Sequence, residues 1–328
     1  MATHPPSAPR GTLVPAVARR ALLGAVLALA VTGCGGAPPP DDVPAAGPSA
    51  DAPLLPAEGA YLGVYYGDRP AAETDEAIGV VPQLHLTYVG WADEWATSGF
   101  VAEDAERGQL SLVNWEPFDA DFTAIVDGTY DEMLTARARE AGALDQPVFV
   151  DLAAEMNEEE GWGGHDPELY VAAYRHVHDV FAAHDGGNVV WVWAPNNVDS
   201  ADAPGALAYY PGEDYVDWTG IDGYNWGTDD PDHAWETFAE VFGPMYEQLQ
   251  PLGKPILIGE TGSSETGGSK AAWIAGIVPA LRESFPDVRA LVWFDVRKER
   301  DWRIGSSDAA ASAFRDLAAD EHLAATVP

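Results

Sequence analysis

The chain has 328 residues with 53 acidic and 17 basic side chains, which gives a formal net charge of -36 at pH 7. A surface this acidic repels nucleic acid and anionic polymers, so we expect no nucleic-acid partner and a neutral ligand. Cys34 is the only cysteine, which excludes an internal disulfide. The acidity says little about the fold.

The first 33 residues have the composition of an export signal. Three arginines precede an uncharged run over residues 21–31, which is too short to remain as a membrane-spanning helix. The tetrapeptide Val-Thr-Gly-Cys34 is similar to a bacterial lipobox, in which the cysteine is lipidated. We therefore expect a lipoprotein signal peptide over residues 1–33. The protein would then be extracytoplasmic, attached to the bacterial cell membrane only through lipidated Cys34, or secreted.

Residues 34–58 are mostly Pro, Ala, Gly, Ser and Asp, with few large apolar side chains. Such a segment buries too little surface to offset its ordering entropy, so we expect a disordered tether. From Gly59 onward the chain changes to regular apolar runs rich in Trp and Tyr. The length of residues 59–325 suits one α/β barrel domain.

Strand-like apolar runs alternate with helical patterns through this domain. We expect strands at residues 61–65, 84–89, 110–114, 148–152, 189–193, 216–221, 256–259 and 291–294. We expect helices at residues 130–141, 167–183, 234–249, 270–284 and 308–319. Alternation through eight strands predicts a single (β/α)8 TIM barrel. The alternative is an open doubly wound sheet, but no Gly-rich phosphate loop follows the first strand.

Two glutamates come just after strand-like runs, where a carboxylate adds nothing to stability. Glu155 follows the fourth expected strand and Glu260 follows the seventh. The carboxyl ends of barrel strands open onto one face, so both side chains would face one cleft. Two carboxyls in one cleft are the minimal machinery for cleaving a glycosidic bond. A separation of about 5–5.5 Å would mean cleavage with retention of configuration.

Six tryptophans fall at or just after expected strand ends: Trp115, Trp162, Trp193, Trp226, Trp293 and Trp302. Because the C–H faces of sugars stack on indole rings, we expect these side chains to line a sugar-binding cleft. Core packing is the alternative for each of them. Tyr224, after the sixth expected strand, is a candidate to hold the carboxylate of Glu260 by a hydrogen bond.

Other candidate chemistry is weaker. His165, His176, His178 and His184 occupy or flank one expected helix, where solvated histidines are more common than metal ligands. The acidic loop at residues 229–232 lacks the spacing and the glycine of an EF-hand calcium loop. No Gly-x-Ser-x-Gly elbow is present, which disfavours an esterase. We therefore expect neither a metal nor a cofactor.

Four long segments resemble glycoside hydrolase family 26, which contains β-mannanases, some β-glucanases and β-1,3-xylanases. They are residues 153–157, 191–197, 210–226 and 254–264, and the resemblance extends from about residue 59 to residue 307. It implies a (β/α)8 barrel and metal-free, retaining endo-type hydrolysis of a β-linked neutral polysaccharide. β-1,4-Mannan is the expected substrate, with β-1,3-1,4-glucan and β-1,3-xylan as alternatives, and we expect a monomer.

The resemblance also assigns roles by matching positions. Glu155 matches the acid/base, Glu260 the nucleophile and Tyr224 the partner of the nucleophile. Trp293 matches the tryptophan under the sugar at the cleavage point, and Asn196 falls in the second matching segment as a substrate-binding candidate.

The segment before the acid/base departs from the family pattern. The family typically reads Arg-x-x-His-Glu-Met-Asn-Gly, whereas this chain reads Asp151-Leu-Ala-Ala154-Glu155-Met-Asn-Glu158. An anion in place of a cation should raise the pKa of both catalytic carboxyls. A raised pKa suits the acid but weakens the nucleophile, which must be ionised. The alternative to an enzyme is therefore a surface lipoprotein that binds glycan on the same barrel without cleaving it.

Overall fold

The computed structural model describes residue 49, residues 51–229 and residues 231–327. The expected signal peptide, the lipidation site Cys34 and most of the expected tether lie outside these residues. Within them, no helix is both long enough and apolar enough to cross a bilayer.

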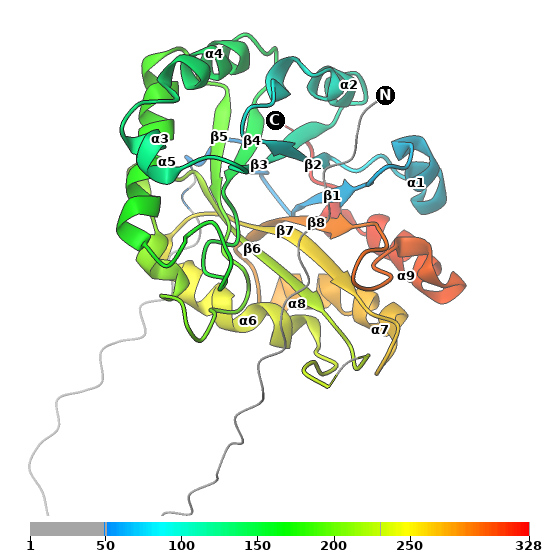
Figure 1. The fold of residues 1–328 in the computed structure, drawn as a ribbon. Helices are drawn as coiled ribbons and strands as arrows, with labels where there is room; N and C mark the ends of the chain where they lie inside the picture. Colours follow the sequence, from blue (N-terminus) through cyan, green and yellow to red (C-terminus); the bar gives the residue numbers. More distant parts are fainter. Residues whose placement is uncertain (1–48, 50, 230, 328) are drawn as a thin grey trace, which may run out of the picture. The chain divides into compact units, whose positions relative to one another are not determined.

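Eight parallel strands close into a barrel in chain order, which confirms the predicted fold class (Figure 1). Each strand pairs with the next one along the chain, and β8 pairs with β1. The strands are β1 (Tyr61–Tyr65), β2 (Leu84–Gly90), β3 (Leu110–Glu116), β4 (Val148–Leu152), β5 (Val189–Trp193), β6 (Trp218–Asn225), β7 (Ile256–Ser263) and β8 (Val288–Phe294).

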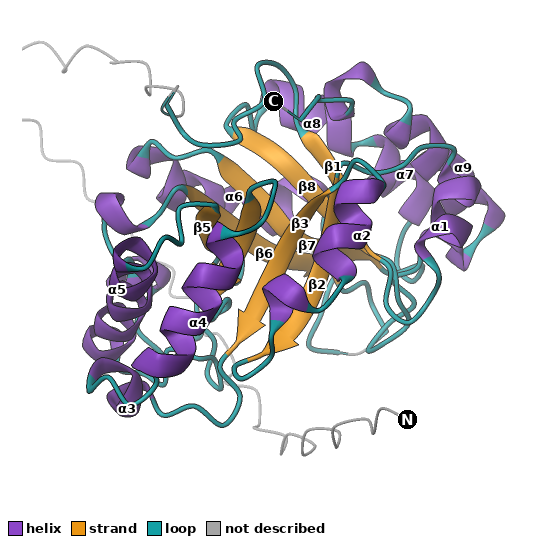
Figure 2. Cartoon of the chain, turned by 90° about the horizontal axis from the view of Figure 1, so that it is seen from above, coloured by secondary structure: helices purple, strands orange, loops and turns teal. Residues whose placement is uncertain are grey.

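Helices surround these strands on the outside of the barrel (Figure 2). In the described part of the chain they are α1 (Ala71–Ile78), α2 (Phe100–Glu106), α3 (Phe122–Val126), α4 (Asp131–Gly142), α5 (Pro167–Ala183), α6 (Phe238–Leu249), α7 (Lys270–Ala275), α8 (Ile277–Glu283) and α9 (Asp308–Ala318). Short 3-10 turns occupy several of the connections between strands and helices.

The two faces of the barrel wall have separate cores. One buried cluster consists almost entirely of strand residues such as Leu84, Phe149 and Leu257, and it fills the inside of the barrel. The other joins the opposite faces of the strands to helix residues such as Phe181 and Phe314. Successive side chains of a strand point to opposite faces, so the position of a residue within its strand decides which core it joins.

The expected strands are all present, but four of them end later than expected: β2 by one residue, β3 by two, and β6 and β7 by four each. β6 extends to Asn225 and β7 to Ser263, so Tyr224 and Glu260 lie within strands rather than after them. Their pairing continues beyond irregularities in register on both strands. These extensions consist mainly of glycine and polar residues. The apolar run from which each strand was predicted therefore ends before the strand does.

The helices differ more from expectation. The helix expected over residues 270–284 is divided at Gly276 into α7 and α8. α6 begins at Phe238 because Thr237 and Glu240 form a capping box at its start. α1, α2 and α3 are an unexpected addition, since helices of eight residues or fewer show little periodicity.

Residues 51–58 pack against the barrel, which corrects the expected end of the tether at residue 58. The two leucines of this segment contact the inner core. The indole of Trp218 donates a hydrogen bond to the carbonyl of Pro53 at 2.8 Å. These contacts give the segment the buried surface that its composition did not suggest.

Candidate active site

An open cleft of about 580 Å³ lies beyond the carboxyl ends of the strands. The active sites of TIM barrels occupy this face, because the loops that follow the strands meet there. Its lining comes from β6, β7, β8 and the loops after β4, β5, β6 and β8: Glu155, Glu158, Asn196, Asn197, Val198, Gly223, Tyr224, Trp226, Asp232, His233, Glu236, Glu260, Phe294, Lys298 and Glu299. Both predicted catalytic glutamates are among these residues.

Two tyrosines hold the carboxylate of Glu260. Tyr224 donates its hydroxyl to Oε2 at 2.6 Å, which is the hydrogen bond expected for this residue. Tyr88, at the carboxyl end of β2, donates to Oε1. Burial raises the pKa of Glu260, whereas both hydroxyls lower it because they stabilise the ionised form. Glu260 is thus held in one orientation with donors on both oxygens.

Tyr88 was not predicted as a site residue, although its position in the strand could have indicated it. It has the same position in the strand alternation as Leu84 and Leu86, which fill the inside of the barrel. A polar aromatic residue with that alternation at the carboxyl end of a strand points into the mouth of the barrel.

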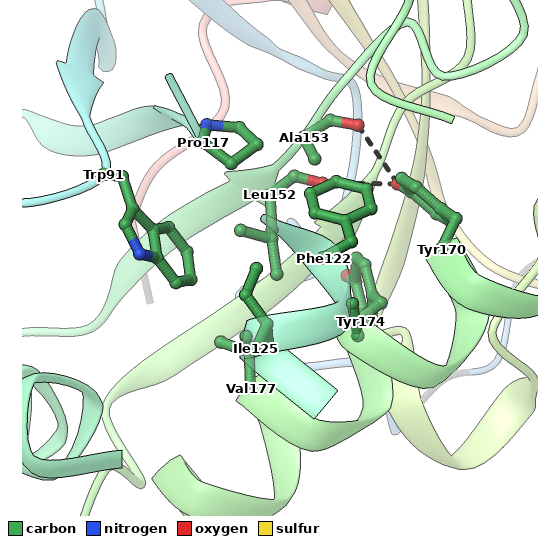
Figure 3. A pocket seen from close by; sticks show the side chains of 10 residues that line it. Trp91, Pro117, Phe122, Ile125, Leu152, Ala153, Tyr170, Tyr174 and Val177 are labelled. Atoms are coloured by element: carbon green, nitrogen blue, oxygen red, sulfur yellow. Dashed lines mark hydrogen bonds between the residues drawn. The ribbon is translucent and has the colours of Figure 1, made fainter. Parts of the chain in front are cut away.

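A sharp turn after β4 presents Glu155 to the cleft. Ala153 and Glu155 both have left-handed backbone conformations, with φ of 53° and 55°. The hydroxyl of Tyr170 on α5 lies 3.4 Å from the carbonyl of Leu152 and 3.1 Å from that of Ala153. Figure 3 shows this hydroxyl above closely packed apolar side chains of α3 and α5. These contacts hold the end of β4 and so fix the start of the turn.

The electrostatic setting of Glu155 favours its protonated form. The pKa of Glu155 is raised to about 8, and burial is the largest cause. The negative charges of Glu260 and Glu158 add to this rise, because a second anion disfavours ionisation. Asn196 and Lys298 oppose it. The rise in pKa expected for Glu155 and Glu260 is therefore present. Its main cause is burial and not the charge of Asp151.

Asp151, at the position where the family pattern has arginine, is buried inside the barrel. Its Oδ1 has no hydrogen-bond partner among the described residues. Burial first, and then the charges of Glu260 and Glu155, raise its pKa well above the usual range. Asp222, paired in register with Glu260, has a pKa raised in the same way. Both aspartates therefore favour the neutral form and add little negative charge beneath the cleft.

Lys298, in the loop after β8, supplies positive charge to the cleft. It lowers the pKa of Glu260 and of Glu155. It also opposes the rise in the pKa of Glu116 at the end of β3, which burial and Glu260 cause and which brings that pKa to about 7. The cation that is missing at position 151 is thus partly replaced from a different loop, which sequence comparison of the acid/base segment could not show.

Three of the six predicted cleft tryptophans lie in the outer core instead. Trp115, Trp193 and Trp293 are completely buried with side chains of the surrounding helices. Their places in the strand alternation point them away from the inside of the barrel. The prediction that these three line the cleft is therefore wrong. Phe294, the residue after Trp293, points inward and lines the cleft where Trp293 was expected.

The other three tryptophans have different positions. Trp226 lines the cleft, with its ring stacked on that of His233 at 4.9 Å between centroids. Trp302 is buried, and its ring centroid lies 4.7 Å from that of Tyr224. It therefore packs against the tyrosine instead of facing the cleft. Trp162 is half-buried and pairs with exposed Phe118, and it is not among the residues that line the cleft.

Asn196 lines the cleft as predicted from the resemblance, and its amide Nδ2 donates to Oε1 of Glu155 at 2.9 Å. Residues 49, 51–229 and 231–327 contain no group of three or more His, Cys, Asp or Glu side chains arranged to hold a metal ion. The histidines considered above have other surroundings: His176, for example, lies 2.6 Å from Oδ1 of Asp131.

A family model and several known proteins match the sequence of this chain. Residues 125–259 match the model of glycosyl hydrolase family 26. Endoglucanase H of Acetivibrio thermocellus is 34% identical over 271 residues, which are 79% of this chain and 30% of that protein. Beta-1,3-xylanase TXYA of Vibrio sp is 26% identical over 52% of this chain and 39% of its own length. A mannan endo-1,4-beta-mannosidase of Bacillus subtilis is 30% identical over 39% of this chain and 30% of its own length.

The chain thus spans about a third of the length of these curated relatives. Among solved structures, a Bacillus subtilis mannanase matches 82% of this chain and 86% of its own with a TM-score of 0.56 and 20% identity. A family 26 β-mannanase from Bacteroides ovatus matches 81% of this chain and 90% of its own with a TM-score of 0.59 and 17% identity. At these identities the two structures share the fold. The chain is thus similar to glycosyl hydrolase family 26 over residues 125–259 and shares its barrel fold with the solved mannanases.

Proposed function

We propose that the chain is a retaining endo-glycoside hydrolase that cleaves a β-linked neutral polysaccharide, with Glu260 as nucleophile and Glu155 as acid/base. The observation that carries this proposal is the contrast between the two carboxyls of one cleft. Glu260 accepts two phenolic hydrogen bonds, which favour the anion that attacks. Glu155, with its pKa raised to about 8, keeps its proton at neutral pH. Carboxyls that differ in this way supply the acid and the nucleophile of a glycosidase.

The reaction proceeds in two steps. Glu260 attacks the anomeric carbon while Glu155 gives its proton to the departing glycosidic oxygen, so the bond between the sugars breaks and a glycosyl ester forms. Glu155, now ionised, takes a proton from water, and the resulting hydroxide attacks the same carbon. The ester bond breaks, Glu260 leaves as a carboxylate, and the product keeps the configuration of the substrate.

The charge and the aromatic lining of the cleft support a neutral sugar chain. Glu158, Glu236 and Glu299 line it beside the catalytic pair and would repel uronate or sulfate groups. We place Phe294 under the sugar at the cleavage point, since it lies where Trp293 was expected. Trp226 offers a second aromatic surface to the chain.

We place a β-glucan backbone ahead of β-1,4-mannan. The similarity to Endoglucanase H covers 79% of this chain, whereas the similarity to the mannanase of Bacillus subtilis covers 39% at lower identity. Mannan, the substrate expected from the resemblance, becomes the second candidate, and it is supported by the mannanases that recur among the relatives. β-1,3-Xylan is supported in the same way by a relative of lower identity.

Incubation of the protein with β-1,3-1,4-glucan, β-mannan and β-1,3-xylan tests the proposal by release of reducing sugar. Glu260→Ala and Glu155→Ala should each reduce the rate by about a hundredfold or more. Glu168→Ala, which removes an exposed acid from α5, is the matched control and should not. The anomer first seen by proton NMR reports retention. Binding of a polysaccharide without release by the wild-type protein would support the non-catalytic alternative, and activity that survives Glu260→Ala would refute the nucleophile.

We further propose that the chain is exported and lipidated at Cys34, on the basis of its arginines, apolar run and lipobox-like tetrapeptide. Cys34→Ser should move the protein from the membrane fraction to the soluble fraction of the producing bacterium. Unchanged membrane retention would refute the anchor.

A further inference from the structure

Asn196 connects the acid/base to a second carboxylate, that of Glu158. One hydrogen-bond contact runs from Nδ2 of Asn196 to Oε1 of Glu155 at 2.9 Å, and another from the same nitrogen to Oε1 of Glu158 at 2.8 Å. A primary amide has two N–H bonds, so each carboxylate can take one. Glu158 stands where the family pattern has glycine, and the reaction described above does not use it.

The protein holds this amide rigidly. The backbone N–H of Asn196 donates to Oδ1 of Asn157 at 2.8 Å, and its Oδ1 accepts from the N–H of Val198 at 3.1 Å. Asn157 is completely buried and donates its own amide to the carbonyl of Asn196 at 3.0 Å. Asn196 therefore has one orientation available, and it is the orientation that serves both carboxylates.

The backbone also fixes the spacing between Glu155 and Glu158. The N–H of Glu158 donates to the carbonyl of Glu155 at 3.2 Å, which closes a turn between them. Gly161 packs directly on that carbonyl, and a Cβ at this position would collide with it. The two side chains thus leave the same turn and meet at the same amide.

Several charged or titratable groups face Glu155, and Glu158 is distinct among them. The others come from β4, β6, β7 and the loop after β8: Asp151, Asp222, Tyr224, Glu260 and Lys298. Of the two acids that most strongly oppose the ionisation of Glu155, Glu260 becomes a neutral ester in the glycosyl-enzyme. Glu158 forms no bond in either step; burial and the charge of Glu260 raise its own pKa, Lys298 lowers it, and formation of the ester removes the part that Glu260 contributes.

We propose that Glu158 is a positioning residue for the acid/base, which holds the Glu155 carboxyl through Asn196 and by its negative charge favours the protonated form of Glu155. In the first step this keeps the proton available for the departing oxygen. In the second step Glu260 is an uncharged ester and no longer raises the pKa of Glu155. The charge of Glu158 then keeps Glu155 basic enough to take a proton from water. The inference rests on the proposed function and adds a third carboxylate to it.

The test compares Glu158→Gln with Glu159→Gln. Glutamine at 158 keeps the size and an acceptor oxygen for Asn196 but removes the charge. The change at 159 removes the same charge from the next residue of the loop, which is also exposed. The alkaline limb of kcat/KM for the polysaccharide should move to lower pH by about half to one unit in Glu158→Gln only.

Two further measurements separate tuning of the acid from a structural role. An aryl glycoside with a dinitrophenol leaving group needs no proton for departure, so its glycosylation step should change little in Glu158→Gln. A 13C NMR titration of the Glu155 carboxyl should show the same fall in pKa without any activity assay. A wild-type protein that cleaves no polysaccharide refutes the proposed function itself. An active wild type with an unmoved titration in Glu158→Gln, or an equal shift in Glu159→Gln, overturns the role of Glu158.

Discussion

Replacing Tyr88 with phenylalanine removes one of the two hydroxyls that hold Glu260. Tyr88 donates to Oε1 of Glu260 and Tyr224 donates to Oε2. The ring of Tyr88 packs edge-on against Tyr65 at 4.9 Å and Phe294 at 6.3 Å between centroids. A phenylalanine ring keeps both packing contacts, so the change isolates the hydroxyl.

The expected size follows from the energy of a hydrogen bond to a charged group. Such a bond contributes about 1.5–3 kcal/mol, and the lower figure is appropriate because water can enter this open cleft. A loss of about 1.5 kcal/mol corresponds to about one pKa unit. Burial already raises the pKa of Glu260 and the hydroxyl of Tyr88 lowers it, so its removal raises the pKa further. Because Glu260 attacks as the anion, the acidic limb of kcat/KM should move about one unit to higher pH.

The assay is kcat/KM on a neutral β-linked polysaccharide across the acidic range. Well below the new pKa, Tyr88→Phe should be about tenfold slower than the wild type, with a smaller difference at neutral pH. Tyr65→Phe is the matched control, since the described residues show no hydrogen bond from Tyr65 to Glu260. An acidic limb that stays in place in Tyr88→Phe, or that moves equally in Tyr65→Phe, would refute the role given to this hydroxyl.

Two further predictions concern the positions of Trp226 and Trp293 and the effect of Glu155 on the free energy of unfolding. Trp226→Ala should raise KM about tenfold through loss of a stacking surface, whereas Trp293→Ala should lower the free energy of unfolding by about 3–5 kcal/mol, measured in urea. A large KM effect confined to Trp293→Ala would contradict the assignment of their positions. Glu155→Gln should stabilise the protein at pH 7 by on the order of 2 kcal/mol but not at pH 4. Folding raises the pKa of Glu155 from 4.5 to about 8, so its favourable contribution is complete below pH 4.5, is lost progressively as the pH rises from there to about 8, and is mostly gone at pH 7. Equal stability changes at both pH values would argue against this.

Local patterns were sufficient to predict the barrel. Buried parallel strands are continuous apolar runs, so all eight could be located, and β1, β4 and β5 have the predicted bounds. α5 also has its predicted bounds, because Asp166 caps its start and a proline follows. Short helices and the polar ends of β6 and β7 were missed, since neither carries a long periodic pattern.

The candidate carboxyls could also be located from the sequence. Glu155 and Glu260 stand out because charged residues follow apolar strands at the one face where barrel strands end. Tyr224 was found by the same argument together with the family resemblance, and the structure contains its expected hydrogen bond. Which acid keeps its proton depends on burial and on neighbouring charges, which only the folded chain defines.

By itself, therefore, the sequence determined the order of the strands, the barrel and the two acids at its mouth. The tertiary structure decided which side chains face the cleft. It turned Trp115, Trp193 and Trp293 outward, because neighbours in a strand point to opposite faces. It also brought Tyr88 to Glu260 across 172 positions of the chain, a contact that only barrel closure creates.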